Sequence, residues 1–256
     1  MTQETKQRTN TVSEAKAAYH AHLTAMNPGQ TNESTYRASG AYYRAEILPL
    51  LPTDKHAAIL DVGSGFGHLV RFVIEQGFTR VGGVELDAGL HQASVKYIGS
   101  RAVFLTHADG LSFLASHPAE YDLIIATDVI EHFPLDDAAQ FAKQVRHALK
   151  PGGRAIFRTP NMANIFGIYS RYMDLTHQTG FTGHSLMQLL RVAGFSSAAV
   201  YVPNWDASGH YHAWQFRLSN WIQRKLFTLQ DRTPPQSFDK NIVVWADVAT
   251  IVSVSK

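Results

Sequence analysis

"AAILDVGSGFGHLV", residues 57–70, is the stretch that decides the fold of this chain. An apolar run leads into an acid, three glycines follow at alternate positions, and an apolar helical pattern begins after them. Glycines between a strand and a helix let the backbone approach a ligand closely, and the start of the helix favours an anionic group there. The stretch therefore predicts a nucleotide-binding loop after the first strand of a sheet, but it does not say which nucleotide binds.

The rest of the chain alternates strand-like runs with helical segments. Further strands are expected at residues 80–86, 102–107, 121–129, 153–160, 196–203 and 241–255. Apolar strands with helices between them are typical of a parallel sheet that is covered on both faces. We therefore expect an α/β fold: a Rossmann-like, seven-stranded, mostly parallel sheet with helices on both faces. The last strand is expected to insert antiparallel at the sheet edge.

The same alternation predicts the domain organisation. Residues 1–50, a polar tail followed by helices, are expected to cover the cofactor site, and residues 51–256 to form the core. Two segments, at about 161–185 and 204–240, interrupt the alternation and are expected to be lid insertions. The second contains a helix, 211–229, whose apolar stripe consists of Tyr211, Trp214, Leu218, Trp221, Ile222, Leu226 and Leu229. We expect this stripe to pack on the core. A homodimer contact or a contact with a membrane surface stays open as an alternative.

The composition excludes several classes of function. The chain has 23 Lys and Arg against 21 Asp and Glu, so it lacks the basic excess typical of nucleic-acid binding, and no nucleic-acid partner is expected. It has no cysteine, which excludes disulfides, thiolate zinc sites and a cysteine nucleophile. Without an apolar run of the ~20 residues that a membrane span needs, or an apolar signal segment in "MTQETKQRTN", the expected location is cytoplasmic.

Three acids stand at the carboxyl ends of expected strands: Glu85, Asp109 and Asp128. In an open parallel sheet, ligands bind beyond these strand ends. Each acid alone is as compatible with a helix N-cap as with a ligand contact. Their occurrence at three successive strand ends favours a ligand site, in which Glu85 is placed to accept from ribose hydroxyls.

Over residues 50–203 and the final strand, the sequence resembles the class I S-adenosylmethionine-dependent methyltransferases. "LDVGSGFG" resembles that family's first motif, "GVELD" its ribose-binding segment, "HADG" its adenine-contacting segment and "LKPGGRAIFRTPN" its fifth-strand motif. The resemblance implies S-adenosylmethionine as the cofactor. The implied donor contacts come from Asp61, Gly63, Gly65, Gly67, Glu85, Leu86, Asp109, Gly110 and Asp128.

Two alternatives from other classes stay open. A NAD-dependent oxidoreductase would carry a third glycine at the sixth position of its fingerprint, and counted from Gly63 that position is His68. The spacing from the loop to Glu85 suits either ligand. A donor-binding protein without catalysis would bind S-adenosylmethionine and turn over no acceptor.

"TDVIEHF", residues 127–133, is the candidate catalytic segment. Asp128, Glu131 and His132 have the spacing of one helix face, and two carboxylates with an imidazole suit a divalent cation. The pattern resembles the metal motif of small-RNA 2′-O-methyltransferases and ubiquinone-type O-methyltransferases, with an aspartate at Asp128 where those enzymes have a glutamate. The resemblance implies His177 as a further ligand, with Mg, Mn or Zn as the metal. A metal-free base role for His132 or His177 and a purely structural role are the alternatives, so the catalytic candidates are Asp128, His132 and His177.

The segment "YMDLTHQTGFTGHSLMQLLRVAGF", residues 172–195, resembles bacterial methyltransferases of polysaccharide and glycolipid biosynthesis. The resemblance implies a hydroxyl of a sugar, glycan or similar polyol as the methyl acceptor. Four nearby rings suit stacking on a sugar, although half of them are expected to belong to the core of the lid instead: Phe166, Tyr169, Tyr172 and Phe181. The expected function is O-methylation with metal assistance. Catechol O-methylation and amine N-methylation of a small molecule are the enzymatic alternatives.

Overall fold

The computed structural model describes residues 14, 15, 18, 19, 21, 25, 33–99, 104–205, 213–230 and 232–249. Within them, strands and helices alternate over the core. The strands are β1 (Ala58–Val62), β2 (Arg80–Glu85), β3 (Phe104–His107), β4 (Tyr121–Thr127), β5 (Leu149–Pro160), β6 (Ser197–Tyr201) and β7 (Asn241–Asp247). The helices are α3 (Glu33–Glu46), α4 (His68–Glu75), α5 (Ala88–Ile98), α6 (Gly110–Ala115), α7 (Leu135–Ala148), α8 (Gly167–Tyr172), α9 (Gly183–Val192) and α10 (Ala213–Leu229), with short 3-10 helices η1 (Leu48–Leu50) and η2 (Ile130–His132).

The strands form one seven-stranded sheet in the order β3-β2-β1-β4-β5-β7-β6. The pairs from β3 to β5 are parallel, whereas β7 runs antiparallel to both β5 and β6. The expected mostly parallel sheet with one antiparallel strand is confirmed. This strand lies one place in from the edge, which β6 forms. Because the end of β6 pairs with the start of β7, Tyr201 with Val243, the connection through α10 stays at one end of the sheet and β7 must run back.

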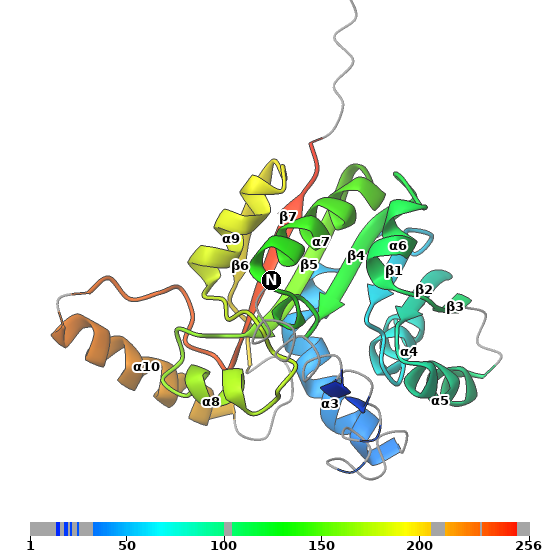
Figure 1. Ribbon diagram of the computed structural model, residues 1–256. Coiled ribbons are helices and arrows are strands. Elements are labelled where there is room, and N and C mark those ends of the chain that lie inside the picture. Colours follow the sequence, from blue (N-terminus) through cyan, green and yellow to red (C-terminus); the bar gives the residue numbers. More distant parts are fainter. Residues whose placement is uncertain are drawn as a thin grey trace, which may run out of the picture.

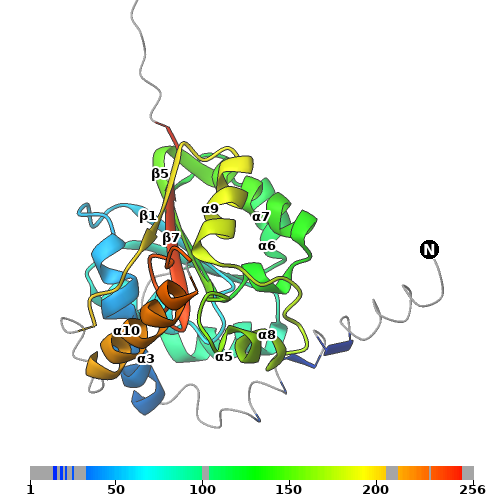
Figure 2. The same cartoon turned by 90° about the vertical axis from the view of Figure 1, so that its left-hand side faces the viewer.

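Helices cover both faces of the sheet (Figures 1 and 2). Because both faces are covered, β1 is buried over its whole length. One face packs against α6, α7 and α9, and the other against α3 and α4. On α7 the buried residues have the spacing of one helix face: Ala138, Phe141, Ala142, Val145 and Ala148.

Ion pairs and a buried ring fix α3 on the sheet. Tyr36 is buried and donates to Glu75 of α4, while Glu33 pairs with Arg71 of α4 at 2.8 Å. At the other end of α3, Glu46 is buried and accepts from the Arg158 Nε of β5 at 2.6 Å. Helix α3 is thus joined to the carboxyl end of the sheet, which carries the candidate site.

Helix α10 forms as expected, but the packing predicted for its apolar stripe is wrong. Its inward face contains Phe216, Asn220, Gln223 and Phe227, and Gln223 is only 1% exposed. Asn220 and Gln223 hydrogen-bond to the segment before β7, and Phe216 stacks on Trp205 at 4.3 Å. Asn220 and Gln223 face inward because their side chains satisfy buried backbone groups. The apolar stripe therefore points outward. Tyr211 lies outside the described residues.

Some other expectations concern residues that the structure does not describe. They include most of residues 1–32 in the expected N-terminal cover, residues 102 and 103 of the third expected strand, and the end of the last strand beyond Ala249. Among the described residues, no helix is both long enough and apolar enough to cross a membrane.

Candidate active site

The glycine loop after β1 has the backbone conformation that only glycine adopts readily. Gly63, Gly65 and Gly67 have φ angles of 72°, 51° and 80°. A Cβ on Gly63 would lie 2.5 Å from Val129 Cγ2, and one on Gly67 would lie 2.6 Å from Ile98 Cδ1. These two glycines are therefore required by close packing. Among the described residues, no atom lies within 4 Å of a Cβ built on Gly65, which lines the cavity.

Glu85 joins the end of β2 to this loop. Its Oε2 accepts from the Gly65 N–H and its Oε1 from the Asp87 N–H, each at 2.8 Å. Asp61 lies buried at the end of β1, and its Oδ1 has no hydrogen-bond partner among the described residues. Burial, followed by the charge of Glu85, raises the pKa of Asp61 well above its usual range. A second carboxyl group thus lies behind the loop, where burial favours its neutral form.

A cavity of about 630 Å³ opens at the carboxyl ends of β1, β2, β3 and β4. Most of the expected donor-site residues line it: Gly63, Gly65, Glu85, Leu86, Asp109, Gly110 and Asp128. Asp61 and Gly67 are not in the lining. Asp109 also caps α6, accepting from the Ser112 N–H at 2.9 Å. The cavity has the size and the mixed apolar and polar lining of a small-molecule site.

Asp128 does not share a helix face with Glu131 and His132. Its φ of 55° turns the chain before η2, and its carboxylate pairs with Arg158, which also binds Glu46. The expected α-helical spacing fails here because the chain takes a left-handed residue and then a 3-10 turn. Asp128 thus lines the cavity beside an arginine and stands apart from the two other residues.

Glu131, His132 and His177 come together as the sequence predicts. One ligand atom from each lies within 4.8 Å of the others, and the imidazole centroids of the two histidines are 4.8 Å apart. Glu131 is 2% exposed; its Oε2 accepts from Thr159 Oγ1 at 2.9 Å, and its Oε1 has no partner among the described residues. Burial, and then the charge of Asp128, raise the pKa of Glu131 to about 8.

Hydrogen bonds set the tautomers of both histidines. Thr176 Oγ1 donates to Asp174 at 2.6 Å, so it accepts from His132 Nδ1 at 2.8 Å. His177 Nδ1 lies 3.0 Å from the carbonyl oxygen of Ser170, which can only accept. Both rings therefore carry their proton on Nδ1 and a lone pair on Nε2. Asp174 orients His132 through Thr176, a role that the sequence did not reveal.

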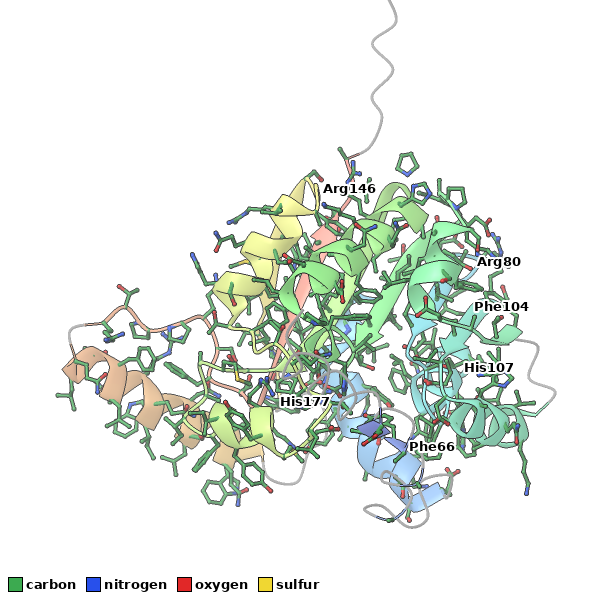
Figure 3. The ribbon with its side chains drawn as sticks, viewed as in Figure 1. Phe66, Arg80, Phe104, His107, Arg146 and His177 are labelled. Carbon is green, nitrogen blue, oxygen red and sulfur yellow. The ribbon has the colours of Figure 1, made fainter. Side chains whose placement is uncertain are left out.

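Backbone hydrogen bonds join the segment after α8 to η2. The N–H groups of Gln178 and Thr179 both donate to the carbonyl oxygen of Glu131, at 2.7 and 3.0 Å. The side chain of Gln178 donates to the carbonyl oxygen of His132 at 2.7 Å. Figure 3 shows His177 beside α8 and His107 beside β3, at the same end of the sheet. This pairing explains how residues far apart in the sequence reach one site.

Tyr19 is a cavity residue that the sequence analysis missed. Its ring lies 5.7 Å from the imidazole of His132, at an interplanar angle of 78°. It also lines the cavity, from a segment that precedes α3 in the chain. Burial, followed by the charge of Asp174, raises the pKa of its hydroxyl. The sequence pointed to Tyr19 only through the expectation that residues 1–50 cover the cofactor site.

The four rings expected to stack on an acceptor do not share one environment. Phe181 is buried in the core, whereas Phe166, Tyr169 and Tyr172 are exposed on and before α8. The stacking prediction for Phe181 is therefore wrong. Its ring packs with α9 and β5 because the strand-like bridge from Asn161 to Phe181 turns it inward.

Comparison with known proteins identifies the class of protein that this fold and cavity define. The sequence profile of the family described as "Methyltransferase domain" matches residues 35–200. The chain belongs to this methyltransferase family, and the expected class I S-adenosylmethionine-dependent methyltransferase is confirmed.

The curated relatives match the chain over a shorter stretch. The ubiquinone biosynthesis O-methyltransferase of Saccharophagus degradans is 33% identical over 105 residues, which are 40% of this chain and 43% of that protein. The match thus spans less than half of the relative's length.

Solved structures share the fold. A SAM-dependent methyltransferase from Archaeoglobus fulgidus superposes with a TM-score of 0.62 at 16% identity, covering 90% of this chain and 99% of that one. Phosphoethanolamine N-methyltransferase 2 of Haemonchus contortus, solved with S-adenosyl-L-methionine, gives a TM-score of 0.55 at 16% identity, over 86% of this chain and 53% of that one.

Proposed function

We propose that the chain is an S-adenosylmethionine-dependent O-methyltransferase that acts on a hydroxyl of a sugar, glycan or similar polyol. The observation that carries the proposal is the Glu131, His132 and His177 cluster beside the methyl-donor cavity. An alcohol is a poor nucleophile until its proton is removed or weakened, whereas an amine is not. A site that places a carboxylate and two imidazoles together suits the oxygen acceptor.

The donor fits the residues at the glycine end of the cavity. The Gly63–Gly67 loop leaves room for close approach, and Glu85 stands where the hydroxyls of a ribose are accepted in nucleotide sites of this kind of sheet. Leu86 and Asp109 lie next along the wall, where the adenine follows the ribose. The two N–H groups that donate to Glu85 fix its carboxylate at the cavity wall.

The donor set of the cluster also fits a divalent metal. One carboxylate and two imidazoles are ligands that Mn²⁺ and Zn²⁺ accept, and Mg²⁺ less readily. The buried Glu131 Oε1 lacks a partner among the described residues, and both histidines direct Nε2 lone pairs away from their backbone or threonine partners. Asp128 pairs with Arg158, so we assign it to the part of the cavity that holds the methyl donor and not to the metal. A bound ion would lower the pKa of a coordinated acceptor hydroxyl.

The transfer itself is a displacement at the methyl carbon. The acceptor oxygen forms a bond to that carbon, the bond from carbon to sulfur breaks, and S-adenosylhomocysteine leaves. Without an ion in the cluster, the proton of the hydroxyl passes to His132 Nε2, whose opposite nitrogen is held by Thr176 and Asp174. A bound ion would occupy this nitrogen, and the coordinated hydroxyl would then lose its proton to solvent. The charged sulfonium activates the methyl group, so the chain mainly orients the two reactants and takes the proton.

The Saccharophagus degradans relative is an O-methyltransferase by name, which supports an oxygen acceptor. The likeness of residues 172–195 to glycan-biosynthesis enzymes supports a sugar hydroxyl over a catechol. A catechol or a small amine then serves as the competing acceptor in the test.

The test is methyl transfer from labelled S-adenosylmethionine to a panel of glycans, catechols and amines. We expect label in a sugar hydroxyl, loss of activity in EDTA and recovery with added Mn²⁺, Zn²⁺ or Mg²⁺. Activity indifferent to EDTA would remove the metal from the proposal, and label only in amines would overturn O-methylation.

The histidine of the later segment offers a matched pair of variants. His177→Ala should lower turnover at least about tenfold while leaving donor affinity by calorimetry unchanged. His184→Ala is the control, because that histidine is exposed on α9. Equal activity of the two variants would remove His177 from the site.

A further inference from the structure

A large apolar surface remains exposed on α8 and α10. On α10 the outward residues include Trp221, 59% exposed, and Leu229, 82% exposed. Exposed apolar residues on and around α8 include Ile168, at 75%. This α8/α10 surface consists of Ile165, Phe166, Ile168, Tyr169, Tyr172, Met173, Leu175, Trp214, Leu218, Trp221, Ile222, Leu226 and Leu229. Apolar patches of this extent mark interaction sites on folded proteins.

Hydrogen bonds on the inward face of α10 determine that its apolar face points outward. Gln223 accepts from the Ile165 N–H at 2.8 Å, which ties α10 to the start of α8. Asn220 accepts from the Phe238 N–H at 2.8 Å and donates to Asp239 at 2.6 Å. A rotation of α10 that buried its apolar stripe would break these bonds and leave buried groups unpaired. The outward stripe is therefore part of the fold.

The charge on α10 has one sign. Its exposed charged residues are Arg217, Arg224 and Lys225, and the sequence holds no acid between Ala207 and Gln230. A two-fold contact through this face would bring the basic residues of both copies into one interface without acids from α10 to match them. An anionic surface matches them, and Lys225 can extend its head group past the apolar side chains that flank it.

The side chains on the stripe are those of helices that lie in a membrane interface. Tryptophans, leucines and isoleucine on one face, with lysine and arginine at its margin, are typical of such helices. Trp214 and Trp221 suit the level of the lipid head groups. Figure 1 places α8 and α10 at the end of the sheet where β4 ends, which is also the end that carries the cavity. Figure 2 shows both helices at the lower end of the molecule.

We propose that the α8/α10 surface docks the protein on an anionic phospholipid membrane. The apolar side chains enter the boundary between head groups and acyl chains, and the basic residues of α10 contact the anionic head groups. This brings the methyl-donor cavity to a lipid surface. The docking does not depend on the identity of the acceptor, so its failure and that of the proposed function are measured separately.

The experiment is co-sedimentation of the full chain with vesicles. Vesicles of phosphatidylglycerol and phosphatidylcholine are compared with vesicles of phosphatidylcholine alone. We expect binding to the anionic vesicles, with a blue shift of tryptophan fluorescence, and weaker binding to the neutral ones. Lys225→Glu should weaken the anionic binding about tenfold, because each basic residue near the surface contributes to the attraction.

The double variant Trp214→Gln, Trp221→Gln should abolish binding and the fluorescence shift. Val192→Gln is the matched control, since that exposed apolar residue lies on α9; it should bind as the parent does. Circular dichroism and S-adenosylmethionine affinity confirm that each variant folds. Absence of parent binding, equal binding by the tryptophan variant, or a vesicle-inert dimer that this variant dissociates in sedimentation velocity would each overturn the proposal.

Discussion

Thr176, which is itself buried, links the half-buried carboxylate of Asp174 to the candidate base. It donates to Asp174 and accepts from His132, so Thr176→Val keeps the volume and removes the bond that orients the imidazole. Loss of such a supporting group lowers activity about 10- to 100-fold in comparable sites. We expect kcat to fall by about tenfold with donor affinity unchanged, measured by steady-state kinetics and calorimetry.

The control for this variant is Thr53→Val, because Thr53 is exposed and away from the cavity. It should leave both parameters unchanged. A Thr176→Val enzyme with the parent's kcat would show that His132 keeps its orientation without the threonine.

Asp61 gives a pH dependence whose sign follows from burial. Its pKa is raised in the folded chain, so the folded state holds the proton at a pH where the unfolded chain has lost it. This carboxyl therefore makes the protein less stable as the pH rises above the ordinary aspartate range. Asp61→Asn has no proton to lose, and its melting temperature should exceed that of the parent at pH 7 and equal it near pH 3.

Thermal denaturation over this pH range measures the effect. Asp136→Asn serves as the control, since Asp136 is exposed on α7. A variant less stable than the parent at pH 7 would show that the ionised Asp61 is held by partners that stabilise it.

At the scale of elements, β5 and α3 are joined by a buried arginine. Arg158 binds the buried Glu46 and the more exposed Asp128. Removing one partner of a buried pair leaves the other charge without compensation, which costs about 3 kcal/mol or more. Arg158→Met should lower the free energy of unfolding by this amount in urea denaturation. The double variant Glu46→Leu, Arg158→Met also removes the carboxylate that Arg158→Met leaves unpaired. It should therefore recover most of the lost free energy of unfolding.

The double variant decides the interpretation. If it unfolds as easily as Arg158→Met alone, the loss comes from packing around Arg158 and not from an uncompensated Glu46. In that case α3 would be held mainly by Tyr36 and the pairs of Arg71.

The elements show which parts of this structure a sequence can predict. Apolar runs between helical segments predicted the strands, because a sheet that is covered on both faces buries its strands over their whole length. The sequence also predicted the glycine loop, since positive φ angles demand glycine. It did not predict the direction of α10, because Asn220 and Gln223 face inward only to bond with a segment after the helix. No helical period encodes such a partner.

The candidate site also contains residues that the sequence predicts and residues that it does not. Glu131 and His132 are neighbours in sequence, and His177 was reached through a resemblance. Thr176, Arg158 and Tyr19 act through partners that other segments supply, so their roles depend on tertiary placement. Asp128 was misplaced because its left-handed backbone breaks the helix on which the spacing relied.

At the scale of the whole molecule, the cavity is lined by residues far apart in the chain, from Tyr19 to Thr176. The contact of Tyr19 with His132 is an edge-to-face ring contact, worth about 1 kcal/mol beyond the area buried. Tyr19→Ala should therefore lower kcat/KM about tenfold, and Tyr19→Phe, which keeps the ring, should stay within about twofold of the parent. Steady-state kinetics with the labelled donor measures both. Equal losses in the two variants would assign the effect to the hydroxyl, whose partners would then be the carboxylates around it, Asp174 first.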